Sequence, residues 1–204
     1  MQQLSTIRDI RFIVLHCSAG NQNNTAQQVQ GFTMQRIKDN GYHVIVEKQP
    51  RNDNITSGVI RMVSDDIKTS GIKQFRDKRG TLLNNSNSIQ ICWIGGLLSD
   101  KYGNVIRDNN RNVWNGYKGN FIASDNRTDY QKDMLKRIVL YYAKNLPNAR
   151  FLGHNQISPD IKSCPNFDVR EFCEQLGVPK QQIYYPDNFG VVEKLPLILR
   201  NNVF

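Results

Sequence analysis

Histidine is scarce in this chain, which has only three among its 204 residues: His16, His43 and His154. Long apolar runs are also absent. A membrane-spanning helix needs about 18 consecutive apolar residues, so we expect no membrane insertion. The first residues contain no apolar stretch of the kind that marks a secretory signal, so we expect synthesis in a cytosol. The four cysteines show no close pairing pattern and are expected as thiols or metal ligands rather than disulfides.

Acidic residues are outnumbered by basic ones. Lysine and arginine total 27 against 18 aspartates and glutamates, which gives a net charge of +9. A charge of this size favours an anionic partner such as a nucleic acid, a membrane surface or an anionic cell-wall polymer. The ordered basic and aromatic pattern of an RNA-recognition domain is missing, so we do not expect a nucleic acid partner.

Apolar runs alternate with helical patterns along the chain. Strands are expected at residues 11–17, 42–46, 58–63, 88–94 and 149–152. Two capping-box patterns, each a threonine followed three residues later by a glutamine, predict helices over 26–39 and 128–145. Gly41 is expected to end the first of these helices. A third helix is predicted after Asp168 and before Gly177.

This alternation predicts an α/β fold with a central mixed β-sheet flanked by helices. We expect a single domain over residues 1–178, with 179–204 as a C-terminal extension too short to be a domain. Residues 64–87 and 99–127 show no regular pattern and are expected to be loops.

Three residues have the chemistry of a zinc site. His16 closes an apolar run, and His154 follows the last predicted strand with Cys164 ten residues later. Two imidazoles and a thiolate are three of the four ligands that zinc takes, and an open fourth position distinguishes a catalytic zinc site. Each residue also has a structural interpretation, as a hydrogen-bonded histidine or an inert thiol. Cys17 alternates with His16 along the strand and is expected in the core.

Four segments together share the pattern of one enzyme family. They read Ile-Val-Leu-His-Cys-Ser-Ala (13–19), Asn-Gly-Tyr-His-Val-Ile (40–45), Asn-Ser-Ile-Gln-Ile-Cys-Trp-Ile-Gly-Gly (87–96), and Gly-His (153–154) followed by Lys-Ser-Cys-Pro-Asn-Phe-Asp (162–168). In this order they resemble the zinc-dependent N-acetylmuramoyl-L-alanine amidases, which include amidase-type bacteriophage lysozymes and peptidoglycan recognition proteins. The resemblance covers about residues 11–176.

The resemblance implies a function and a set of site residues. His16, His154 and Cys164 match the ligands of one zinc ion, and Tyr42 and Lys162 match catalytic residues. The implied reaction is hydrolysis of the amide bond between N-acetylmuramic acid and L-alanine in bacterial peptidoglycan. Zinc and the lysine would stabilise the oxyanion, and the tyrosine would orient water or pass a proton to the leaving amine.

The resemblance also suggests a biological setting. Because a signal is missing and the lysine matches the phage enzymes, we expect a phage endolysin or a virion-associated lysin that acts as a monomer. An endolysin would stay in the cytoplasm of the infected host until it is released to the cell wall. The alternatives are a non-catalytic module that binds peptidoglycan, which the retained Cys164 argues against, and a basic nucleic-acid-binding protein.

Substrate contacts are expected from two places. Trp114, Tyr117 and Phe121 lie in the long polar segment 99–127, where they could stack on sugars or only anchor the loop. Asn87, which begins the third matching segment, is a further candidate for substrate binding.

Two departures from the family pattern concern the surroundings of the metal. The family often has a histidine shortly before the Asn-Ser-Ile strand, but residues 78–85 contain none. Gln90 stands where a glycine is common. We therefore expect a remodelled substrate-binding wall over residues 60–87. His43 alternates to the other side of its strand from Tyr42, so we interpret it as structural, with an active-site role as the alternative.

Overall fold

A mixed five-stranded sheet forms the centre of the molecule, which we describe from a computed structural model over residues 8–50, 58–77, 80–107, 121–157 and 163–185. The strand order is β3-β2-β6-β1-β7. The strands are β1 (Phe12–Cys17), β2 (Val44–Val46), β3 (Val59–Arg61), β6 (Ser88–Trp93) and β7 (Arg150–Gly153). All neighbouring strands are parallel except β3, which runs antiparallel to β2. The predicted mixed sheet is confirmed.

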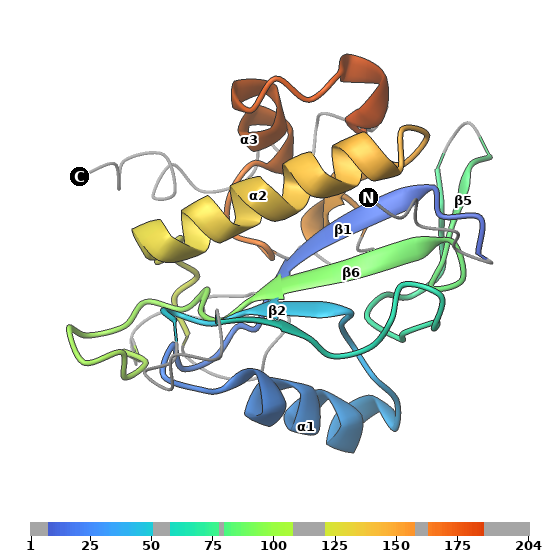
Figure 1. Cartoon of the computed structure of the whole chain (residues 1–204). Coiled ribbons are helices and arrows are strands. Elements are labelled where there is room, and N and C mark those ends of the chain that lie inside the picture. Colours follow the sequence, from blue (N-terminus) through green and yellow to red (C-terminus); the bar gives the residue numbers. More distant parts are fainter. Residues whose placement is uncertain (1–7, 51–57, 78–79, 108–120, 158–162, 186–204) are drawn as a thin grey trace.

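The two long strands at the centre of the sheet, β1 and β6, are buried along their whole length. Their near-continuous apolar sequences suit parallel strands that are covered on both faces. Helix α1 (Ala26–Ile37) covers one face, and α2 (Asp129–Asn145) and α3 (Val169–Gln175) lie over the other (Figure 1). This arrangement brings the carboxyl ends of β1, β6 and β7 to one edge of the sheet.

Local capping explains where the helices begin. Thr25 and Thr128 each accept a hydrogen bond from the glutamine backbone three residues on, and each glutamine side chain bonds back, as predicted. Asp168 caps α3 in the expected place. The end of α1 differs from the prediction: the chain leaves the helix at Lys38, whose φ of 60° is left-handed, rather than at Gly41.

The prediction that residues 64–87 form only loops is wrong. A small antiparallel pair, β4 (Phe75–Arg76) and β5 (Leu82–Leu83), lies in this segment. Leu83 is buried with Ile72 against the side chains of Phe12 and Val14. The few apolar residues of this basic stretch were too sparse to show a period, but they suffice to anchor the pair on the sheet.

Part of the predicted C-terminal extension packs against the sheet. Ile183 forms a β-bridge with Phe151 of β7, after the short 3-10 helix η2 (Lys180–Gln182). The Tyr184 ring meets Phe12 edge to face at 6.3 Å between centroids. The division at residue 178 stays a prediction. No helix among the described residues is long and apolar enough to cross a membrane.

Candidate metal centre

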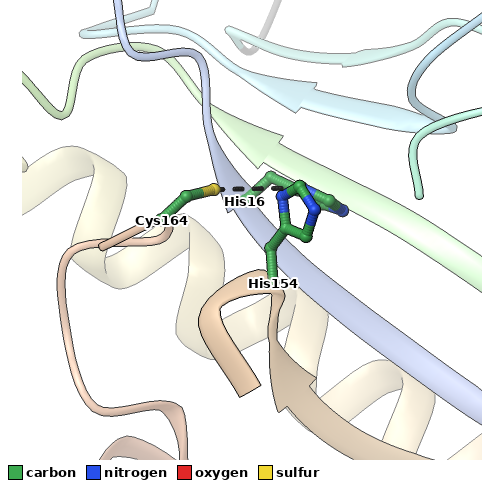
Figure 2. A group of neighbouring side chains, drawn as sticks. All are labelled: His16, His154 and Cys164. Carbon is green, nitrogen blue, oxygen red and sulfur yellow. Dashed lines mark hydrogen bonds between the residues drawn. The ribbon is translucent and has the colours of Figure 1, made fainter. Parts of the chain in front are cut away.

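The two histidines and the cysteine come from neighbouring elements at one edge of the sheet. His16 is the second-last residue of β1, and His154 begins the short 3-10 helix η1 (His154–Gln156) directly after β7. Since β1 and β7 are parallel partners, their carboxyl ends lie side by side. Cys164 lies on the loop that follows η1, and Figure 2 shows the three side chains converging.

The donor atoms of this triad have a spacing that suits one metal ion. One ligand atom from each of the three residues lies within 4.8 Å of the others. Cys164 Sγ is 3.9 Å from His16 Nδ1, and the two imidazole centroids are 4.7 Å apart. Tetrahedral zinc with bonds of about 2.3 Å to sulfur and about 2.1 Å to nitrogen places these donors about 3.6 Å apart. The Cys164–His16 pair at 3.9 Å is within a few tenths of an ångström of this spacing, and a pair at the 4.8 Å limit would have to close by about 1.2 Å to share one metal ion.

The surroundings of Cys164 favour a thiolate. Burial opposes its ionisation, but hydrogen bonds with Cys17 and His154 outweigh burial and hold the pKa of Cys164 well below its ordinary value. The backbone N–H of Cys17 lies 3.2 Å from Cys164 Sγ. The hydrogen bond to Cys164, with burial, raises the pKa of Cys17 well above its ordinary value. Cys17 is thus the neutral partner and Cys164 the candidate metal ligand, and the prediction that Cys17 is a core residue is confirmed.

Tyr42 lies beside the triad. Its ring meets the His16 ring edge to face at 5.4 Å between centroids, and it packs among buried residues of α1, β2 and β6. Only 8% of the residue is exposed, and its side chain is hydrogen-bonded to Cys92. The structure thus brings this candidate catalytic residue together with a candidate ligand.

Other candidates are placed elsewhere or lie outside the described residues. Asn87 precedes β6 at its amino end, where its side chain bonds to Leu82 O and Asn84 N, and it is not brought together with the triad. Lys162, Trp114 and Tyr117 lie outside the described residues. Phe121, at the described end of the 99–127 segment, forms a bridge with Arg107.

His43 has the structural role that we predicted. It is fully buried, and its Nδ1 accepts a hydrogen bond from the Gln90 backbone at 2.9 Å. Its Nε2 lies 2.9 Å from Ile67 O. These contacts join β6 to the segment after β3.

The sequence analysis identified Gln90 only as a departure from the family pattern, yet its side chain contacts His16, one of the candidate ligands. Gln90 Oε1 lies 2.7 Å from His16 Nε2. The two residues are on adjacent strands but are not register partners, since Gln90 pairs with Val14. Only the register of β1 against β6 reveals this diagonal contact.

Comparison with known families agrees with this geometry. A sequence model of the family described as N-acetylmuramoyl-L-alanine amidase matches residues 6–167. No curated protein matches the chain.

Solved structures of amidases share the fold. The N-acetylmuramoyl-L-alanine amidase LysC from Clostridium intestinale is 18% identical with a TM-score of 0.52, over 87% of this chain and 92% of that one. The endolysin amidase LysCS from the same organism is 17% identical with a TM-score of 0.51, over 84% and 86%. AmpDh3 from Pseudomonas aeruginosa, in complex with anhydromuramic pentapeptide, is 16% identical with a TM-score of 0.54, over 87% and 64%.

Proposed function

The chain belongs to the N-acetylmuramoyl-L-alanine amidase family, and we propose that it cleaves bacterial peptidoglycan as an enzyme with one zinc ion. The bond cleaved joins the lactyl group of N-acetylmuramic acid to the first L-alanine of the stem peptide. The observation that carries the zinc assignment is the convergence of His16, His154 and Cys164 within 4.8 Å.

The donor set fits zinc better than other common metals. Imidazole nitrogen and thiolate sulfur are ligands that zinc prefers, whereas magnesium and calcium prefer oxygen. Three protein ligands leave one tetrahedral position open to water or substrate. When bound there, zinc supplies a Lewis acid that polarises the scissile carbonyl and activates water for attack.

We assign the remaining chemistry to two side chains. The Tyr42 ring packs edge-on against His16 and is nearly buried, so its hydroxyl has a defined position relative to the triad. In our proposal Tyr42 orients the attacking water or passes a proton to the leaving amine. Lys162 precedes the ligand Cys164 by two residues, and its ammonium would stabilise the negative charge that develops on the carbonyl oxygen. The support for Lys162 is its position in the family motif.

We further propose that the protein is a phage lysin, either an endolysin or part of a virion. The support is the match of Lys162 to the phage enzymes and the net charge of +9, which suits an anionic cell envelope. In our proposal an endolysin stays in the cytoplasm of the infected host until it is released. Adding the purified protein to bacteria with intact and with permeabilised membranes, and following turbidity, tests its access to the wall.

The test of the enzymatic proposal is chemical. Purified protein is incubated with peptidoglycan, with added zinc or with a chelator, and new N-terminal alanine on the stem peptides is quantified. We expect release of this amine with zinc and its loss with chelator. An absence of new alanine N-termini in excess zinc would contradict the proposal and would favour a module that only binds peptidoglycan.

Two cysteine variants separate the ligand role from general stability. Cys164→Ala removes the thiolate and should abolish both stoichiometric zinc binding and activity. Cys173→Ala alters another buried cysteine, on the core-facing side of α3, and should leave zinc content unchanged. Full zinc content in the Cys164 variant would refute the ligand assignment.

A further inference from the structure

A buried glutamine side chain stands next to the metal-site histidine. Gln90 is in the middle of the central strand β6 and has no exposed surface. A buried amide is costly unless both its oxygen and its nitrogen find partners. Gln90 Oε1 lies 2.7 Å from His16 Nε2, and Gln90 Nε2 lies 2.7 Å from Ser88 Oγ. Both ends of the amide are therefore used.

The direction of these hydrogen bonds follows from the contact that Ser88 makes on its other side. Ser88 Oγ lies 2.6 Å from Asn84 O, a carbonyl that can only accept, so the single hydroxyl hydrogen of Ser88 is donated there. The Ser88 oxygen can then only accept from Gln90, which requires the amide NH₂ of Gln90 to face it. The Gln90 carbonyl oxygen consequently faces His16 and accepts a hydrogen from Nε2.

This order of donors leaves one nitrogen of His16 for a metal. Because Nε2 is committed to Gln90, the ring offers Nδ1, the nitrogen that lies 3.9 Å from Cys164 Sγ. A metal-binding histidine commonly has its other nitrogen held by an outer partner, which sets both the tautomer and the ring orientation.

The backbone around Gln90 is fixed as well. Its own N–H donates to His43 Nδ1 at 2.9 Å. On its other side is Gly71, where an added Cβ would lie 3.0 Å from Gln90 Cγ and 3.2 Å from Gln90 Oε1. The missing side chain at residue 71 leaves the room that the amide occupies.

We propose that Gln90 is a positioning residue for the metal site: it holds the hydrogen of His16 on Nε2 and so presents Nδ1 to zinc. The proposal rests on the proposed zinc function. Gln90 does not touch the reacting atoms in this scheme, and Ser88 orients Gln90 in turn.

Nuclear magnetic resonance tests the tautomer without any activity measurement. With only three histidines in the chain, long-range proton–nitrogen spectra of uniformly ¹⁵N-labelled protein can be assigned ring by ring. We expect His16 Nε2 to carry a hydrogen in both the metal-free and the zinc-loaded full-length protein. A metal-free wild-type protein in which Nε2 is bare and Nδ1 carries the hydrogen would overturn the proposal.

Two variants and a matched control extend the test to zinc affinity, measured by competition with a chromogenic chelator. Gln90→Met keeps the length of the side chain but removes the acceptor, and it should weaken zinc binding about 10- to 100-fold. Ser88→Ala keeps Gln90 but frees its amide to turn, and a smaller loss in the same direction is expected. Gln131→Met removes another fully buried amide, which bonds to Val46 O and Ile94 O, and should bind zinc as the wild type does.

The outcomes distinguish a failure of this proposal from a failure of the proposed zinc function on which it rests. A purely structural Gln90 would make Gln90→Met and Gln131→Met alike in zinc affinity, and that result would refute the positioning role. Should Gln90→Met fail to fold, Ser88→Ala and the wild-type tautomer still decide the question. Wild-type protein that binds no zinc would contradict the proposed function, whereas the spectrum would still report which nitrogen Gln90 holds.

Discussion

Acidification should destabilise this protein through His43, before most carboxylates titrate. The imidazole is fully buried, its Nδ1 accepts from the Gln90 backbone, and its Nε2 is left to donate to Ile67 O. Both ring nitrogens are thus satisfied in the neutral form. Protonation would place a second hydrogen on Nδ1, against the N–H that already points at it.

The magnitude follows from the pKa of His43. Burial lowers this pKa from 6.5 to about 4, the hydrogen bond to Ile67 opposes that change, and the Arg8 guanidinium assists it. The unfolded chain therefore takes up a proton at higher pH than the folded chain does. The stabilisation is fully present above pH 6.5 and is lost as the pH falls toward 4. The whole effect is about 3 kcal/mol, of which about 2 kcal/mol disappears between about pH 7 and 5.

Urea unfolding of chelator-treated protein at several pH values between 7 and 5 measures this loss without a contribution from metal release. His43→Asn is the matched variant, because its amide oxygen can still accept from the Gln90 N–H but does not titrate. We expect the variant to be less stable at pH 7 and to lose about 2 kcal/mol less than the wild type on acidification. Equal losses in the two proteins would refute a neutral His43 in the folded state.

Three further predictions concern stability and can be checked by urea unfolding of the metal-free protein. Gly71→Ala places a methyl group against the Gly41 carbonyl oxygen and should lower the free energy of unfolding by about 1–3 kcal/mol through overpacking. Unchanged stability would show that the backbone at residues 41 and 71 shifts to make room for the methyl group. Tyr142→Phe removes the hydroxyl that donates to the buried Asp65 carboxylate at 2.9 Å and should lower the free energy of unfolding by about 2 kcal/mol. An unchanged free energy of unfolding would contradict this and would indicate that water replaces the hydroxyl. Thr25→Ala removes the N-cap of α1 and should cost about 1 kcal/mol, whereas Thr25→Ser should be nearly neutral.

Helix N-termini and buried strands, which depend on residues close together in the sequence, could be predicted. The Thr-x-x-Gln capping boxes locate both long helices because the bonds that form them span three residues. The buried strand β1 is evident from its continuous apolar run, and β6 from an apolar run that only Ser88 and Gln90 interrupt. The β4–β5 pair could not be predicted, because two-residue strands have no period to detect and depend on tertiary contacts such as those of Leu83.

The candidate site was accessible to sequence reasoning only in part. The residue types of His16, His154 and Cys164 suggested zinc, but nothing local indicates that segments so far apart meet. The ordered family motifs supplied that link. The contact between Gln90 and His16 depends on the register of two parallel strands, and neither motif nor composition encodes it.

The separation of the candidate ligands along the chain also bears on how the enzyme is made. His16 and Cys164 are 148 positions apart, and β1 finds its partner β7 only near the end of the fold. When β1 and β6 have left the ribosome, the nascent chain contains only His16 of the triad, so it has no complete metal site. Under the proposed function, zinc held by the full triad would stabilise only the finished fold. In the proposed zinc enzyme the triad is therefore complete only when Cys164, eleven residues beyond the last strand of the sheet, has been made.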